Sequence, residues 1–327
     1  MDSTTVFIVY TNSIAGGYGI GTYVKQLAAG IIKYTSVTPV VVQLISNAGI
    51  VEEKSENGYL ELNIPTPDDI HSYHFNKYAR NYYYSVVEGI LQRYSNVNNI
   101  FLLNSYIPEL AKIIKQRNLY NCRIIKTVHF LPAAFAATST YQSSDDYLAS
   151  NPINSRDTVF GTFKKADCII TLTNHTKKII LDHYRLNGKK IFVIPNGIES
   201  VKAISPSEKQ VLKEKWGWNL KDKLILLAGR IDSGKGGVQL IRAFNQIADK
   251  YTDARLIIAG DGTYATYMDE VSMPGKVTFT GKLSHKRLYE LYSFVDIGVV
   301  PSLHEETSFV AIEMMYKSPR NLNSELS

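Results

Sequence analysis

The sequence has few cysteines and no apolar run long enough to cross a membrane. Its two cysteines, Cys122 and Cys168, stand beside or within β-like runs and lack metal-like spacing, so we interpret both as reduced core residues. No apolar run approaches the roughly 20 residues that a bilayer requires, and the first residues lack the basic start of a secretion signal. Together these absences predict a cytoplasmic protein.

Internal repeats, low-complexity tracts and motifs that read DNA or RNA are also absent. The 327 residues are 45% hydrophobic and 20% charged, which predicts a folded globular chain with two domains. The net charge of +6 permits nucleic acid, anionic lipid or phosphorylated small molecules as partners. Because the basic residues are spread along the chain, we rank nucleic acid lowest and expect no nucleic-acid partner.

Short β-branched runs alternate with amphipathic stretches along the chain. Near-continuous apolar strands separated by helices predict an α/β protein with parallel sheets covered on both faces. The expected strands lie at 5–10, 38–45, 99–104, 123–130, 168–173, 190–196, 223–230, 254–260, 276–281 and 296–302, and the expected helices at 20–34, 71–94, 107–118, 174–186, 236–250 and 284–294.

The alternation is interrupted once, by the polar and strand-free residues 197–222. Within them Ser205 can cap a short helix that begins at Pro206. We therefore expect two tandem doubly wound, Rossmann-like domains, residues 1–200 and residues 201–327. Ligands of such sheets bind at the carboxyl ends of the strands, and the cleft between two domains is the expected site.

The glycine-rich segment GGYGIGTY, residues 16–23, is an incomplete dinucleotide fingerprint. Counting G-x-G-x-x-G from Gly17 places Thr22 at the third glycine, and no acidic residue follows the second strand for a ribose. A redox role is therefore not supported. Two alternatives stay open: a tight strand-to-helix turn, or a close approach of the backbone to a ligand at a helix N-terminus.

Two segments of the second half carry charges suited to a diphosphate. LLAGRIDSGKGG, residues 226–237, places Arg230 at a strand end and Lys235 in a glycine-rich turn. It is not a Walker loop, and two solvated basic residues are the alternative. In PSLHEETSFVAIEMM, residues 301–315, Ser308 can cap a helix. The free amides of residues 308–310 would then hold an anion.

Glu305 lies before this helix and Glu313 more than one turn inside it, so the two carboxylates can flank a ligand that has a phosphate between hydroxyls. A nucleotide-sugar has that chemistry. The alternative is an acidic cap followed by an ordinary helical glutamate.

This E-x7-E pair resembles the signature of retaining glycosyltransferases of family 4, which have the GT-B fold. The resemblance covers residues 5 to 315 and is specific because its segments occur in the family's order. Those segments are GGYGIGTY, KTVHF (126–130), IPNGIE (194–199), GRIDSGKG, IIAGDG (257–262) and PSLHEE (301–306).

The resemblance implies that residues 1–200 form the acceptor-side domain and residues 201–327 the nucleotide-sugar-binding domain. It also implies a role for each candidate site residue. Arg230 and Lys235 would hold the donor diphosphate and neutralise the leaving group, and the helix start at Ser308, Phe309 and Val310 would bind the donor phosphate. Glu313 would bind the ribose and Glu305 would contact the transferred sugar. Gly16 and Gly17 would approach the donor and acceptor, and His129 would line the reaction centre. For His129 the alternative is an ordinary strand-end histidine.

The implied reaction moves a sugar from a UDP- or GDP-sugar to a hydroxyl of a glycan or lipid-linked acceptor, with retention. No Asp-x-Asp motif stands at a strand end, and Asp145 and Asp146 lie in a polar stretch. We therefore expect neither metal nor cofactor, as in the family.

The chain departs from the family pattern in two places. Thr307 and Ser308 stand where the family usually has an aromatic residue and a glycine, a variant similar to bacterial surface-polysaccharide enzymes. The family also continues with further strands and a last helix, whereas here a polar run with Pro319 follows Met315. We therefore expect an incomplete second domain, a C-terminally truncated chain and impaired activity.

Residues 71–94 hold six tyrosines among basic residues. They could contact a membrane surface at the inner face or a lipid-linked acceptor, or pack on the sheet with their hydroxyls outward. Three functions thus remain: a glycosyltransferase, a catalytically impaired nucleotide-sugar-binding or scaffold protein, and a sugar-nucleotide epimerase. The ordered motifs favour the first over the third.

Overall fold

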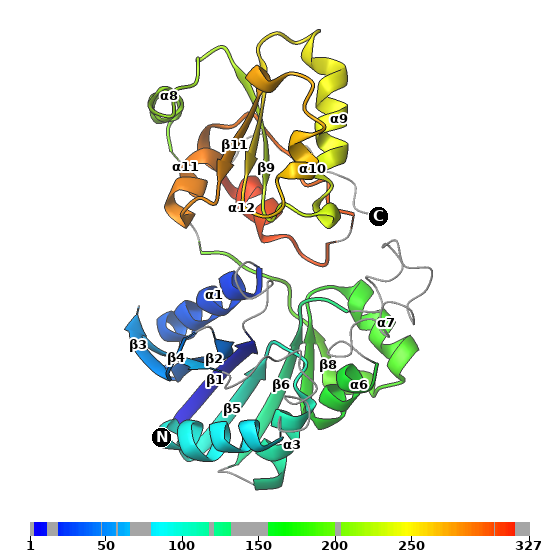
Figure 1. The fold of residues 1–327 in the computed structure, drawn as a ribbon. Helices are drawn as coiled ribbons and strands as arrows, with labels where there is room; N and C mark the ends of the chain where they lie inside the picture. Colours follow the sequence, from blue (N-terminus) through cyan, green and yellow to red (C-terminus); the bar gives the residue numbers. More distant parts are fainter. Residues whose placement is uncertain are drawn as a thin grey trace. The chain divides into compact units, whose positions relative to one another are not determined.

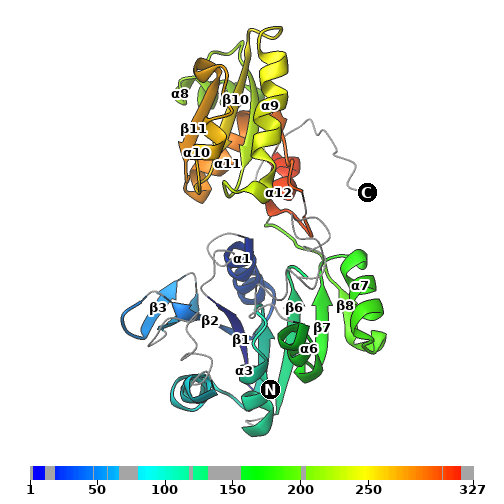
Figure 2. The same cartoon turned by 45° about the vertical axis from the view of Figure 1, so that its right-hand side comes forward.

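The computed structural model describes residues 3–11, 19–46, 48–56, 58–65, 80–117, 121–131, 156–199, 204–303 and 305–317. The chain divides into two compact units, residues 1–197 and residues 198–327. Each unit contains one sheet with helices packed against it, as Figures 1 and 2 show.

The first unit is built on an eight-stranded sheet with the order β3-β4-β2-β1-β5-β6-β7-β8. All its pairings are parallel except that of β3 with β4. The strands are β1 (Thr4–Thr11), β2 (Thr38–Ser46), β3 (Glu52–Glu56), β4 (Tyr59–Pro65), β5 (Asn98–Leu103), β6 (Cys122–Val128), β7 (Cys168–Thr171) and β8 (Ile191–Val193). The six apolar runs expected in this half are confirmed as strands.

Helices cover both faces of this sheet, which explains why its central strands are apolar throughout. Along β1, Val6 and Ile8 face helix α1 (Gly19–Tyr34), where they pack with Val24. Phe7 and Val9 face the opposite side, which is covered by α3 (Pro108–Arg117), α6 (Arg156–Lys165) and α7 (Asn174–Tyr184).

Two parts of the first unit differ from the expectation. The hairpin β3–β4 was not predicted, because the sequence of β3, EEKSE, is an edge strand without an apolar pattern. The described end of the expected helix 71–94 is not one regular α-helix: it passes through a π-helical turn, Val86–Ile90, into a 3-10 turn, Leu91–Tyr94. Tyr83 is buried in the core beside this segment, which supports packing of the tyrosines on the sheet.

The second unit has a four-stranded parallel sheet with the order β11-β10-β9-β12. The strands are β9 (Lys223–Ala228), β10 (Ala254–Ala259), β11 (Val277–Gly281) and β12 (Ile297–Gly298), and the helices are α8 (Pro206–Lys215), α9 (Gly237–Ala248), α10 (Ala265–Met268), α11 (His285–Phe294) and α12 (Phe309–Lys317). α9 and α10 pack on one face, and α8, α11 and α12 on the other.

Of two elements predicted for this unit, one is confirmed and the other is shorter than predicted. Ser205 caps α8 as predicted and forms a full capping box with Glu208. Strand β12 contains two residues, much shorter than the expected strand 296–302. The expected truncation concerns residues beyond Lys317, which lie outside the described residues, and it stays a prediction.

Candidate functional site

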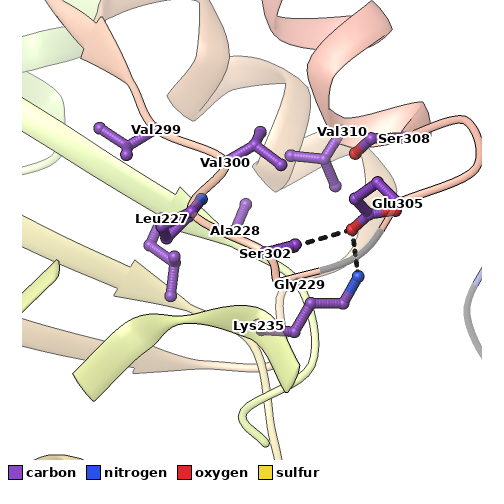
Figure 3. A pocket seen from close by; sticks show the side chains of 11 residues that line it. Leu227, Ala228, Gly229, Lys235, Val299, Val300, Ser302, Glu305, Ser308 and Val310 are labelled. Atoms are coloured by element: carbon purple, nitrogen blue, oxygen red, sulfur yellow. Dashed lines mark hydrogen bonds and ion pairs between the residues drawn. The ribbon is translucent and has the colours of Figure 1, made fainter. Parts of the chain in front are cut away.

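A pocket opens at the carboxyl ends of β9 and β12, within the second unit (Figure 3). Its cavity volume is about 40 Å³, and it opens to solvent. Parallel α/β sheets bind ligands at this edge. The polar side chains that line the pocket come from the two expected segments, and they are those of Lys235, Ser302, Glu305 and Ser308.

Lys235 and Glu305 form an ion pair inside this pocket. Ser302 Oγ donates a hydrogen bond of 2.8 Å to the same carboxylate oxygen, Glu305 Oε1. The two charged side chains keep only 26% and 15% of their surface exposed, so solvent screens the pair less than a surface pair. An anionic ligand that reaches Lys235 would therefore compete with Glu305 for the ammonium group.

The glycine-rich loop lies close to the loop that carries Glu305. Gly236 adopts a φ of +68°, and a Cβ added there would overlap the carbonyl oxygen of Pro301. The Leu303 amide donates to the Gly234 carbonyl at 3.0 Å, which joins the same two loops. Only glycine at position 236 permits this approach, and the approach brings Lys235 to Glu305.

Helix α12 begins at the pocket. Ser308 Oγ accepts a hydrogen bond of 3.3 Å from the Ala311 amide, so the predicted cap is confirmed. Ser308 and Val310 line the pocket, while Phe309 is buried in the core. Because the first amides of a helix have no partner within the helix, this end carries partial positive charge. The pocket thus combines an ammonium group with a helix N-terminus.

Glu313 and Arg230 are placed differently from the pocket residues. The Glu313 side chain is almost fully buried against α11, where Tyr289 Oη donates to its carboxylate at 3.1 Å and His285 Nε2 lies 3.4 Å away. Burial and the nearby Glu313 carboxylate raise the pKa of Tyr289. Arg230 forms an ion pair with Asp232 at 3.3 Å. Neither residue lines the pocket, so their contacts with ribose and diphosphate stay predictions.

In the first unit, His129 follows β6 at the carboxyl edge of the sheet. Its Nε2 lies 2.8 Å from Asn104 Oδ1, and the Tyr23 ring packs edge-on against the imidazole at a centroid distance of 4.5 Å. Burial, with a contribution from the positive charge of Lys126, lowers the pKa of His129 to about 3. His129 is therefore neutral at physiological pH. Gly16 and Gly17, which were expected at the site, lie outside the described residues, and so do Asp145 and Asp146 of the polar stretch.

Lys126 is buried on β6, three residues before His129. Its Nζ donates to the Thr127 carbonyl at 2.5 Å and lies 4.3 Å from the centre of the Tyr106 ring. Burial lowers the pKa of Lys126 to about 7. Among the described residues no carboxylate pairs with this amine.

Several partners of the site residues were missed in the sequence. Ser302 orients Glu305, Asn104 binds His129, and Tyr289 binds Glu313. Asn104 had a recognisable signal, because it is the polar residue at the carboxyl end of a central apolar strand. Tyr289 had none, because its contact depends on the packing of α11 against α12.

Within the described ranges, no group of three or more His, Cys, Asp or Glu residues could hold a metal ion. No helix in those ranges is long and apolar enough to span a bilayer. The need for a metal in the reaction is not tested by this finding, and metal independence stays a prediction.

Two family models match the chain, one in each unit. "Glycosyltransferase Family 4" matches residues 18–202, more than half of the 327 residues, and "Glycosyl transferases group 1" matches residues 208–318. An uncharacterized glycosyltransferase of Methanocaldococcus jannaschii is 31% identical over 154 residues, which are 45% of this chain and 39% of that protein. The match thus spans about two fifths of this curated relative.

Solved structures of low sequence identity share the fold. Sucrose-phosphate synthase from Thermosynechococcus elongatus has a TM-score of 0.70 at 17% identity, over 96% of this chain and 79% of that one. The catalytic domain of starch synthase IV from Arabidopsis thaliana, bound to ADP and acarbose, has a TM-score of 0.65 at 14% identity, over 96% and 81%. With the matching family models and the two-unit α/β fold, these likenesses lead to one conclusion: the chain belongs to glycosyltransferase family 4 and has the GT-B fold.

Proposed function

We propose that the protein transfers a sugar from a UDP- or GDP-sugar to a hydroxyl group with retention of the anomeric configuration. The observation that carries the proposal is the pocket of the second unit, where Lys235 and the N-terminus of α12 converge. A diphosphate is the ligand that best fits a cation beside free helix amides. In support, the starch synthase structure of the same fold holds ADP, a nucleoside diphosphate.

The proposed chemistry is stabilisation of the leaving diphosphate. When the bond between sugar and phosphate breaks, negative charge develops on the phosphate oxygens. Lys235, Arg230 and the first amides of α12 would stabilise this charge, each strong donor by roughly 3 kcal/mol. As Lys235 turns to the phosphate, its ion pair with Glu305 opens. The Glu305 carboxylate is then released to contact the hydroxyls of the transferred sugar.

The acceptor and the cellular setting belong to the same proposal. A glycan or lipid-linked hydroxyl in surface-polysaccharide synthesis would accept the sugar, in the cytoplasm or at the inner face of the membrane. No metal or cofactor enters this scheme, because the cations of the chain supply the positive charge. The described tyrosines next to residue 83 pack on the sheet, so they do not support a membrane contact.

A donor panel tests the proposal. The purified chain is incubated with UDP-, GDP- and ADP-sugars and candidate hydroxyl acceptors, and release of the nucleoside diphosphate is measured. The anomeric configuration of any product is read by NMR. We expect release of the nucleoside diphosphate from the sugar donors of one nucleotide, and a product that retains the anomeric configuration of the donor. Binding without release would favour the impaired binding or scaffold protein, and no binding of any nucleotide would contradict both.

A further inference from the structure

The hydrogen bonds of Asn104 determine which nitrogen of His129 carries the proton. Asn104 lies directly after β5, between β1 and β6, and is 3% exposed. Its Nδ2 donates to the carbonyls of Val9 and Leu102, both at 3.3 Å, and its backbone amide donates to Val9 at 2.8 Å. Flipping the amide would point Oδ1 at two carbonyl oxygens, so the orientation is fixed.

With this orientation, Oδ1 faces Nε2 of His129 at 2.8 Å. An amide oxygen can only accept a hydrogen bond, so the imidazole must donate from Nε2. In a neutral imidazole the other nitrogen, Nδ1, then has a lone pair and no proton. Within the described part of the chain, the structure records no hydrogen bond to Nδ1.

The surroundings of the ring keep it neutral. The described groups that contact the ring are Tyr23 from α1 and Asn104 after β5. The charge of Lys126 acts on the ring from the other face of the sheet, where its side chain packs on Tyr106, and none of these three groups is a carboxylate. Burial raises the pKa of Tyr23, so its phenol is uncharged. A second proton on the imidazole would be desolvated and would lie near the Lys126 amine. The ring therefore supplies no positive charge.

We propose that Asn104 is a positioning residue: it fixes the proton of a neutral His129 on Nε2 and leaves Nδ1 as a hydrogen-bond acceptor for a substrate hydroxyl. The substrate half of this inference rests on the proposed glycosyl transfer, whereas the position of the proton does not. His129 then recognises a hydroxyl group of a sugar and not the charge of the diphosphate.

NMR of the chain labelled with ¹⁵N-histidine tests the position of the proton directly. The chain has seven histidines, and loss of one set of signals in His129→Gln assigns the resonances. Correlations between ring nitrogens and ring carbon-bound protons report which nitrogen is protonated. We expect the neutral Nε2–H form throughout pH 5 to 8. A neutral Nδ1–H form, or titration of His129 within that range, would overturn the inference.

Asn104→Asp tests the role of the amide. In Asn104→Asp one carboxylate oxygen still accepts from Nε2, while the other replaces the donor to the Val9 and Leu102 carbonyls, so we expect the variant to be less stable. The negative charge stabilises the imidazolium, so we expect the His129 titration to move upward by at least one pH unit. Asn99→Asp is the matched control, because Asn99 lies within β5, is 1% exposed and binds Asn96 rather than His129. An unchanged titration in a folded Asn104→Asp protein would contradict the role. If that variant does not fold, the wild-type spectrum still decides the inference.

Kinetics separate this inference from the proposed function. If the donor panel shows sugar transfer, we expect Asn104→Asp to lower kcat/KM at acidic pH, because Nδ1 becomes protonated there. Asn99→Asp should leave the pH dependence of kcat/KM unchanged. A folded Asn104→Asp protein with an unchanged pH profile would remove the substrate half. A chain that transfers no sugar but shows the Nε2–H form would instead contradict the proposed function alone.

Discussion

At the scale of single residues, Lys126 is a buried amine that lowers the stability of the first unit. Its pKa falls from 10.5 to about 7 because burial disfavours the charged form. Between these two values the unfolded chain binds a proton that the folded chain does not. Stability therefore rises with pH across this window, by about 1.4 kcal/mol per pH unit from this group alone.

Replacing Lys126 with methionine tests this account. We expect Lys126→Met to stabilise the first unit at pH 7 and to lose most of this advantage by pH 10, a change on the order of 3–4 kcal/mol in the difference from wild type. Urea unfolding at both pH values measures it. The exposed Lys165→Met serves as the control, and an advantage that is equal at pH 7 and pH 10 would contradict the account.

Glu305 is the residue that holds Lys235 before a ligand binds. Glu305→Gln keeps the shape but removes the charge that competes with a phosphate, so we expect UDP or GDP to bind about 5-fold more tightly, roughly 1 kcal/mol. Transfer should fall, because the sugar loses its carboxylate contact. Calorimetric titration gives the affinity. Weaker nucleotide binding by this variant would show that Glu305 assists the diphosphate instead of competing with it.

At the scale of elements, the contact between the glycine-rich loop and the loop before α12 shapes the pocket. Gly236→Ala places a Cβ against the Pro301 carbonyl at a φ of +68°, and backbone must move to accommodate it. We expect a loss of more than about 2 kcal/mol from the second unit and weaker nucleotide binding. Thermal unfolding and titration measure both effects. Gly275→Ala, whose Cβ meets nothing within 4 Å, should be nearly neutral.

The elements also show how far the sequence leads. The apolar runs predicted the central strands because parallel strands buried on both faces have no other pattern. The caps at Ser205 and Ser308 followed from helix chemistry. The edge strand β3 has no apolar signal, and the ion pair of Lys235 with Glu305 joins residues 70 positions apart. Such contacts depend on how the loops pack and could not be read from spacing.

At the scale of the whole molecule, the two units have separate hydrophobic cores. The described core residues of the first unit form clusters on the two faces of its sheet, and those of the second unit form two others. Substitutions in different cores share no partners. The stability of each unit should therefore respond to its own residues.

A double variant tests this independence. The effects of Lys126→Met and Gly236→Ala on unfolding free energy should add to within about 0.5 kcal/mol, each acting on the unfolding of its own unit. Urea unfolding of wild type, the two single variants and the double variant gives the coupling energy between the two substitutions. A coupling energy of more than about 1 kcal/mol would show that the units stabilise each other.

The central claim is that the pocket of the second unit binds a nucleoside diphosphate through Lys235. Calorimetric titration of UDP, GDP and ADP into wild type and Lys235→Ala tests it most directly, with Lys223→Ala as a control because Lys223 is exposed at the start of β9. The account predicts that at least one of the three nucleotides binds wild type and Lys223→Ala with equal affinity. The affinity of the same nucleotide for Lys235→Ala should be at least about 10-fold lower. Equal affinity for wild type and a folded Lys235→Ala protein would contradict it.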